Sequence, residues 1–224
     1  MSVILPVSFG EALDKLTILE LKLHFIKDEK KLINVRKEYD ELYNILSTYI
    51  DKVRSAYNLL YNVNKRIWIL QDEIRDNIKP VSDYEKVVEE NDARCRIKNK
   101  INHCLSSQFY EEKGYKKKRV IFHIPFEAHD VLKCIGVVRY LSTVNDETIV
   151  CCENLEAFDL AKLTFQDDTS IVVVKENKFK RDEYKSCEEK FVKFKWCDNT
   201  SDEKYYEQFE IPQIDKVSVK DYLY

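Results

Sequence analysis

Apolar and polar residues recur with a helical period over the first part of the chain. Between residues 8 and 27 the apolar positions fall on two faces of one helix, at about 100° per residue. One face holds Ala12, Leu16, Leu19, Leu23 and Ile26, and the other holds Ile18, Leu21 and Phe25. A helix that is apolar on two sides is packed on two sides. We therefore expect the other helices of this region to surround residues 8–27.

Capping chemistry marks the start of this helix. Pro6 cannot belong to the helix body, which fixes where the helix begins. Ser8 and Glu11 have the spacing of a capping box, in which each side chain bonds the backbone N–H of the other residue. Glu11 also belongs to a polar stripe with Lys15 and Lys22. Asp14 falls inside the second apolar face, where a charge needs a partner.

Helical periodicity continues to residue 105, with interruptions. A second helix is expected after the potential cap Asp28, and its pattern weakens near Thr48, resumes, and ends at Pro80. Ser82 and Glu85 have the spacing of another capping box, which predicts a further helix over about 83–105. Long helices of this period pack side by side, as in a bundle or an antiparallel coiled coil.

The period changes after a polar segment at residues 106–118. Apolar runs that predict strands then alternate with patterns that predict helices, which is typical of a βαβαβ unit with a parallel sheet. The expected strands are 120–124, 148–152 and 171–174, the expected helices are 131–141 and 155–165, and less regular patterns indicate a strand at 191–196 and a short helix at 200–209. We therefore predict a helical domain at 1–105, a linker at 106–118 and an α/β domain at 119–224.

Composition narrows the function classes. Basic and acidic residues are nearly balanced, at 37 and 40, so the chain lacks the basic excess that nucleic-acid binding requires. No apolar run approaches the ~18 residues of a membrane span, and no signal-peptide pattern is present. Seven cysteines without a C-x-x-C pair indicate reduced thiols and a cytoplasmic protein. The excess of Lys, Asn, Ile and Tyr over Gly suggests an AT-rich genome, such as that of a large DNA virus.

The loop after the first expected strand carries one candidate site. Ligands of open parallel sheets bind at the carboxyl ends of strands, where His129 and Asp130 would stand at the start of a helix. They could serve as a catalytic base or bind a polar ligand. Alternatively, Asp130 only caps the helix and His129 is a solvated loop residue, which is the commoner arrangement. The loop contains no glycine, so a phosphate-binding loop is not expected.

The helical half carries the other candidate. Asp14 on an apolar face, with Arg94 and Lys98 on another helix, could form a structural ion-pair network or a small anion pocket. We favour the network, because buried charges are retained when they are paired. No cofactor is implied. We predict no metal site, because neither His103-Cys104 nor His123 with His129 has zinc-ligand spacing.

The first half resembles an uncharacterised, mostly bacterial family of helical proteins often found among genes for surface polysaccharides. The resemblance rests on Pro6-Val7-Ser8-Phe9-Gly10-Glu11, Asp14-Lys15 and Thr17-Ile18-Leu19-Glu20, and on later matches at Leu32, Asn34-Val35-Arg36, Ile74-Arg75, Asn91-Asp92, Arg94, Ile97-Lys98 and Ile101-Asn102. It covers most of residues 3–105 and brings no activity with it. Its polar positions are the candidate ligand-binding residues: Asp14, Lys15, Arg75, Asn91, Arg94 and Lys98.

The second half resembles the N-terminal Rossmann-like half of GT-B glycosyltransferases. The matching residues are His123-Ile124-Pro125-Phe126, Asp130, Gly136, Val138-Arg139-Tyr140-Leu141, Asp167-Asp168, Tyr206-Glu207-Gln208 and Ile211-Pro212. In such enzymes the residue at the position of Asp130 can act as the base, and a second Rossmann domain holds most of the nucleotide-sugar. Here the glycines before Asp130 are replaced by Glu127-Ala128-His129, and no second Rossmann domain follows.

The fold class expected from both halves is a helical bundle followed by a small Rossmann-like α/β domain with a parallel sheet. The expected function is that of an accessory or scaffold protein in glycan or sugar metabolism, with a degenerate glycosyltransferase-like domain. The alternative is a glycosyltransferase subunit that uses a nucleotide-sugar together with a partner chain. The expected partners are a nucleotide-sugar or glycan, and a protein or second copy bound through the helical domain.

Overall fold

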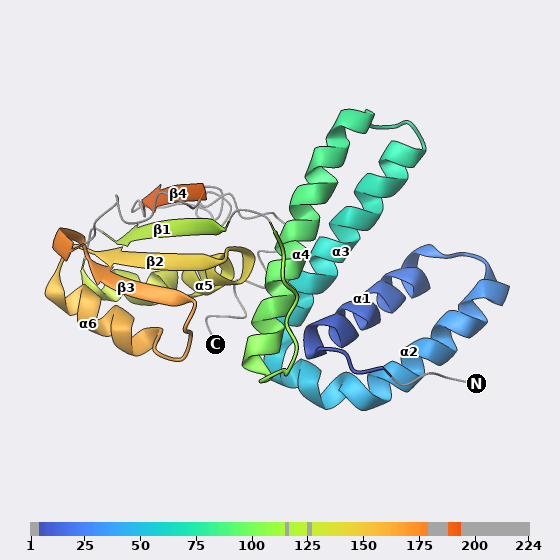
Figure 1. The fold of residues 1–224 in the computed structure, drawn as a ribbon, viewed down its shortest axis with the longest axis horizontal. Coiled ribbons are helices and arrows are strands. Elements are labelled where there is room, and N and C mark those ends of the chain that lie inside the picture. The colour runs from blue at the N-terminus through green and yellow to red at the C-terminus, as the bar shows by residue number, and fades with distance from the viewer. Residues whose placement is uncertain (1–4, 115–116, 125–126, 179–187, 194–224) are drawn as a thin grey trace. The chain divides into compact units, whose positions relative to one another are not determined.

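The computed structural model describes residues 5–114, 117–124, 127–178 and 188–193 of the 224-residue chain. These divide into two compact units, Met1–Glu112 and Lys113–Tyr224. The first is helical and the second is an α/β unit with a parallel sheet, as the sequence predicts (Figure 1). The helix expected at 200–209 lies outside the described residues.

The helical unit is organised around its first helix. Its elements are α1 (Phe9–Phe25), α2 (Glu29–Ile50), the 3-10 turn η1 (Asp51–Val53), α3 (Arg54–Arg75), the 3-10 turn η2 (Val81–Asp83) and α4 (Tyr84–Cys104). Helix α1 packs against each of the other three helices, and Leu13 and Leu16 are completely buried. This confirms the expected central position of α1. The packing of three helices around α1 is that of a helical bundle, and it does not support the alternative of an antiparallel coiled coil.

The helix starts show which capping predictions were right. Asp28 caps α2, as expected. Half of the predicted Ser8–Glu11 capping box is present, because the Ser8 side chain accepts from the Glu11 backbone N–H at 3.1 Å. The Glu11 carboxylate instead accepts from Lys98 of α4. The capping box predicted from Ser82 and Glu85 is wrong. Residues Val81–Asp83 turn as a 3-10 helix instead, and the N-cap of α4, Asp83, makes no side-chain capping bond.

The α/β unit contains β1 (Lys118–Ile124), α5 (Ala128–Val144), β2 (Glu147–Cys152), α6 (Leu155–Thr164), β3 (Ile171–Lys175), the 3-10 turn η3 (Glu176–Lys178) and β4 (Glu188–Lys193). Its four strands are parallel, in the order β3-β2-β1-β4. The strand expected at 191–196 overlaps β4 at 191–193, and its residues 194–196 lie outside the described residues. This strand order is that of the first four strands of a doubly wound sheet. Helices α5 and α6 pack against each other on one face of the sheet (Figure 1).

The predicted linker 106–118 is partly fixed to the helical unit. The Asn99 amide of α4 donates to the Glu111 carbonyl at 2.8 Å, and its oxygen accepts from the Glu111 N–H at 3.1 Å. Asn99 therefore pairs with this segment much as a neighbouring strand would. The polar composition of residues 106–118 predicted an open linker. Composition alone does not show that a side chain distant in the sequence, here Asn99, forms hydrogen bonds with the backbone of this segment.

Candidate functional site

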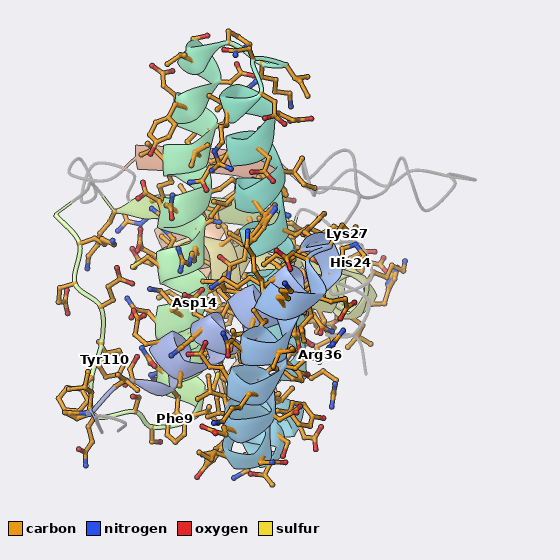
Figure 2. The ribbon with its side chains drawn as sticks, turned by 90° about the vertical axis from the view of Figure 1, so that its right-hand side faces the viewer. Phe9, Asp14, His24, Lys27, Arg36 and Tyr110 are labelled. Carbon is orange, nitrogen blue, oxygen red and sulfur yellow. The ribbon has the colours of Figure 1, made fainter. Side chains whose placement is uncertain are left out.

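The Asp14 carboxylate is the centre of a buried polar network between α1, α3 and α4. It is 3% exposed, and its Oδ1 accepts from Arg94 Nε and from Asn64 Nδ2, each at 2.8 Å. The Arg94 Nη2 also donates to Asp14 Oδ2, so the pair is bidentate. The Asn64 amide donates to Thr17 Oγ1 at 2.8 Å, which links α3 to α1 once more. Figure 2 labels Asp14 on α1.

This geometry is that of the structural network favoured from the sequence. The hydrogen bond to Asp14 raises the pKa of Arg94, against the effect of burial, so the guanidinium is held in its charged form. Asn91 belongs to the same cluster, because its Oδ1 accepts from Arg94 Nη1 at 3.4 Å. The positive charge of Arg94 is thereby balanced within the protein.

Lys98 lies one helical turn further along α4 and has different partners from those expected. Its ammonium donates to Glu11 of α1 at 2.7 Å and pairs with Glu111, and not with Asp14. Burial alone would lower the pKa of Lys98, but the hydrogen bonds to Glu11 and Glu111 raise it above its ordinary value. Two carboxylates beside one ammonium make this an unfavourable place for an anion.

The other two predicted ligand residues of this half lie elsewhere. Lys15 pairs with Glu38 of α2 at 2.6 Å, and both side chains are largely exposed. Arg75, the last residue of α3, pairs with the neighbouring Asp72 at 2.6 Å and is also exposed. The structure therefore brings Asp14, Asn91 and Arg94 together, and gives Lys15 and Arg75 separate surface partners.

His129 and Asp130 stand at the start of α5, as expected, but their roles differ. Glu127 is the N-cap, and it forms a capping box with Asp130, whose Oδ2 accepts from the Glu127 N–H at 3.1 Å. Asp130 is 3% exposed, and its Oδ1 lies 3.3 Å from both Lys133 Nζ and His129 Nε2. The His129 side chain is 58% exposed. Asp130 is thus the third residue of α5, and its carboxylate stabilises the start of the helix by accepting from the backbone N–H of the N-cap.

A cavity of about 330 Å³ lies between α1, α2 and α3, and it was not predicted from the sequence. At its wall, the Glu20 carboxylate of α1 accepts from the Tyr57 hydroxyl at 2.9 Å and from the Tyr39 hydroxyl at 3.4 Å. Tyr39 and Tyr43 stack, with ring centroids 5.6 Å apart. The rest of the lining consists of one apolar side chain, Ile50, and of hydroxyl and charged groups: Ser47, Thr48, Asp51 and Arg54.

The electrostatics of this cavity follow from burial. Burial raises the pKa of Glu20, although the hydrogen bonds from Tyr57 and Tyr39 act in the opposite direction. Burial and the nearby Glu20 charge raise the pKa of Tyr39 to about 12, and they also raise the pKa of Tyr57. The two phenols therefore remain hydrogen-bond donors at neutral pH. The sequence carried one signal of this cavity. Tyr39 and Tyr43 stand four residues apart on one helix, and Glu20 is an acidic residue of the preceding helix.

The comparisons with known proteins concern mainly the helical unit. A family model described as a family of unknown function (DUF6165) matches residues 3–128, more than half of the chain. Comparison with curated proteins and with solved structures finds no match. Nothing in these comparisons supports the glycosyltransferase resemblance of the second half or a viral source, and both stay expectations. The Asp14 network and the Glu20 cavity lie within the matched residues. The chain belongs to the DUF6165 family.

Proposed function

We propose that the protein is an accessory module of glycan or sugar metabolism, and that its helical unit binds a carbohydrate in the Glu20 cavity. The observation that carries this proposal is the cavity itself. Its volume of about 330 Å³ is within the range of small-molecule sites. Its lining combines a carboxylate, hydroxyl groups and the rings of Tyr39 and Tyr43.

These groups suit a polyhydroxylated ligand. A carboxylate accepts hydrogen bonds from sugar hydroxyls, and such charge-assisted bonds are among the stronger ones. Ser47 and Thr48 can both donate and accept, which matches the mixed character of a hydroxyl group. The tyrosine rings offer apolar faces with a polar end, which suits the apolar faces of a sugar ring.

The α/β unit supports an accessory role over the glycosyltransferase alternative. A catalytic base must reach its substrate within hydrogen-bond distance. Asp130 is buried in the capping box of α5 and faces Lys133, an arrangement that serves helix stability. The expected protein partner, or a second copy of the chain, belongs to this proposal as the means by which an accessory module acts.

A thermal-shift screen tests the proposal. A ligand that binds only the folded state raises the unfolding midpoint by mass action. We expect free mono- and oligosaccharides to raise it, and Tyr43→Ala to abolish the shift. Tyr43 is 43% exposed, so its removal should not unfold the protein. Tyr84→Ala is the matched control, because Tyr84 is an exposed tyrosine of α4 outside the cavity lining.

Two outcomes would contradict the proposal. A shift with nucleotide-sugars that Tyr43→Ala leaves intact would favour the glycosyltransferase alternative. A shift with organic cations such as choline, and none with sugars, would mean that Glu20 and the tyrosines form a cation site.

A further inference from the structure

The carboxyl ends of three adjacent parallel strands bring together one histidine and two glutamates. His123 is the next-to-last residue of β1, Glu153 directly follows β2, and Glu176 directly follows β3. In the sheet register His123 pairs with Cys151, which in turn pairs with Val174, so the three strands end at the same edge. This is the edge where open parallel sheets bind ligands.

The distances within this group are those of ligands on a common metal ion. His123 Nε2 lies 3.5 Å from Glu153 Oε1 and 3.3 Å from Glu176 Oε1. One ligand atom from each residue lies within 4.8 Å of the others. Around a tetrahedral zinc ion with bonds of about 2.0–2.1 Å, neighbouring ligand atoms are about 3.3 Å apart. An N–H···O hydrogen bond is commonly shorter, about 2.7–3.2 Å.

We propose that His123, Glu153 and Glu176 form a binding site for a divalent transition-metal ion. Two carboxylates balance the charge of the ion, and a neutral imidazole supplies the nitrogen ligand that such ions prefer over Mg²⁺. The His123 side chain is 6% exposed and is fixed by β1, whereas Glu153 and Glu176 are 38% and 57% exposed. The group therefore has a rigid buried ligand and a side open to solvent.

Three protein ligands leave at least one coordination position for water or a substrate oxygen. That ligand count is typical of catalytic rather than structural zinc sites. The proposed site is independent of the carbohydrate site, because its three residues belong to the α/β unit. The family match ends at residue 128, so it includes His123 and neither glutamate.

Isothermal titration of the EDTA-treated full chain with Zn²⁺ tests this inference. We expect one Zn²⁺ per chain, undisplaced by excess Mg²⁺, and Glu153→Gln and Glu176→Gln should each weaken binding at least about tenfold. Glu156→Gln is the matched control, because Glu156 is an exposed glutamate in the first turn of α6. His103→Asn controls for zinc held at the surface beside Cys104.

The outcomes separate the alternatives. Loss of binding in both ligand variants, with normal binding in Glu156→Gln and His103→Asn, supports the site. Absence of binding to the wild-type chain, or equal binding by wild type and both glutamate variants, would overturn it. Both glutamates are partly exposed, so the variants should fold, and circular dichroism checks this.

Discussion

At the scale of single residues, the Asp14 carboxylate shows how a buried charge is kept in this protein. A buried ionised carboxylate loses its hydration, and this cost is recovered only when its lone pairs are satisfied. Arg94 supplies two donors and Asn64 supplies a third. The result ties three helices at one point and explains why Asp14 can lie on an apolar face.

Asp14→Asn should be strongly destabilising. The substitution removes the negative charge and leaves the partly buried Arg94 without its counter-ion, which can cost up to about 3–5 kcal/mol when the pair is fully buried. Asp72→Asn is the matched control, because its pair with Arg75 is exposed and should be worth at most about 1 kcal/mol. Urea unfolding of both variants measures the difference. A neutral Asp14→Asn would mean that the network does not hold the helices together.

Glu20→Gln should stabilise the protein at neutral pH. Because the folded-state pKa of Glu20 is raised, its stabilising contribution is fully present below the ordinary value of 4.5 and is lost as pH rises through the raised pKa. The glutamine variant cannot ionise, so its advantage in free energy of unfolding should shrink as pH falls from 7 toward 4.5. Urea unfolding across this range tests it, with the exposed Glu41→Gln as control. An advantage that grows on acidification would contradict the assignment.

The residue-level predictions succeeded where a local rule applied. Asp14 on an apolar face required a cationic partner, and Arg94 on a polar stripe was the right candidate. Asn64 and Thr17 were not predicted as members of the network. A neutral polar residue in a helix does not require a charged partner as a buried carboxylate does, so its sequence position gives no indication of a partner. His123, Glu153 and Glu176 were missed because their proximity comes from strand order, and the spacing of histidines along the chain says nothing about it.

At the scale of elements, the crossing of α1 over α4 depends on Gly10. A Cβ at this position would lie 2.5 Å from the Lys98 carbonyl oxygen and 3.0 Å from Asn102 Oδ1. The Gly10 N–H also donates to Asn102 Oδ1 at 2.6 Å. The motif Pro6–Glu11 therefore includes a glycine because the backbones of two helices meet there, which is a structural role.

Gly10→Ala should destabilise the helical unit by about 1–3 kcal/mol, because the new methyl group forces α1 away from the α4 backbone. Gly114→Ala is the control, since a Cβ there meets nothing within 4 Å. It should be neutral or slightly stabilising through its effect on the unfolded chain. Thermal and urea unfolding of the two variants check this. Equal effects would show that α1 can move without cost.

The sequence pattern predicted which regions form helices and strands, but it did not predict correctly where every helix begins. Apolar periodicity predicted helical structure over the regions of α1 to α4 and the strands, because burial of one face determines both patterns. The break between α2 and α3 at Asp51–Val53 was indicated only as a weakening of the pattern near Thr48. The predicted capping box at Ser8 was correct for the Ser8 side chain, and the box at Ser82 was wrong. At the start of α5, Glu127 is the cap and Asp130 occupies the third helical position. The same residue types serve turns, caps and first-turn positions, so spacing alone does not distinguish them.

At the scale of the whole molecule, two compact units meet in sequence near residue 112. Neither unit has a helix in its described residues that is long and apolar enough to cross a membrane. The contacts of Asn99 and Lys98 with Glu111 attach the chain to α4 up to this point. The first exposed positions beyond it are Glu112, Lys113 and Gly114.

Limited trypsin digestion should therefore cut first at Lys113 or Lys117 and leave a resistant helical fragment. Both lysines are exposed and follow the attached segment. Mass spectrometry of the early fragments identifies the cut. Asn99→Ala removes both hydrogen bonds to Glu111, so it should also expose residues 106–112, readable with a less specific protease. First cuts within α1 or α3 would contradict the division into units.

The long-range partners of α1 have a consequence for synthesis on the ribosome. Asp14 is 80 positions from Arg94, and Gly10 is 92 positions from Asn102. At about 5–20 residues per second, a ribosome needs roughly 4–16 s to make the intervening chain. Through that interval α1 has been made, but its partners Arg94, Lys98 and Asn102 on α4 have not. The helical unit therefore completes its core only when α4 emerges, so a nascent chain arrested before residue 94 should remain sensitive to proteases.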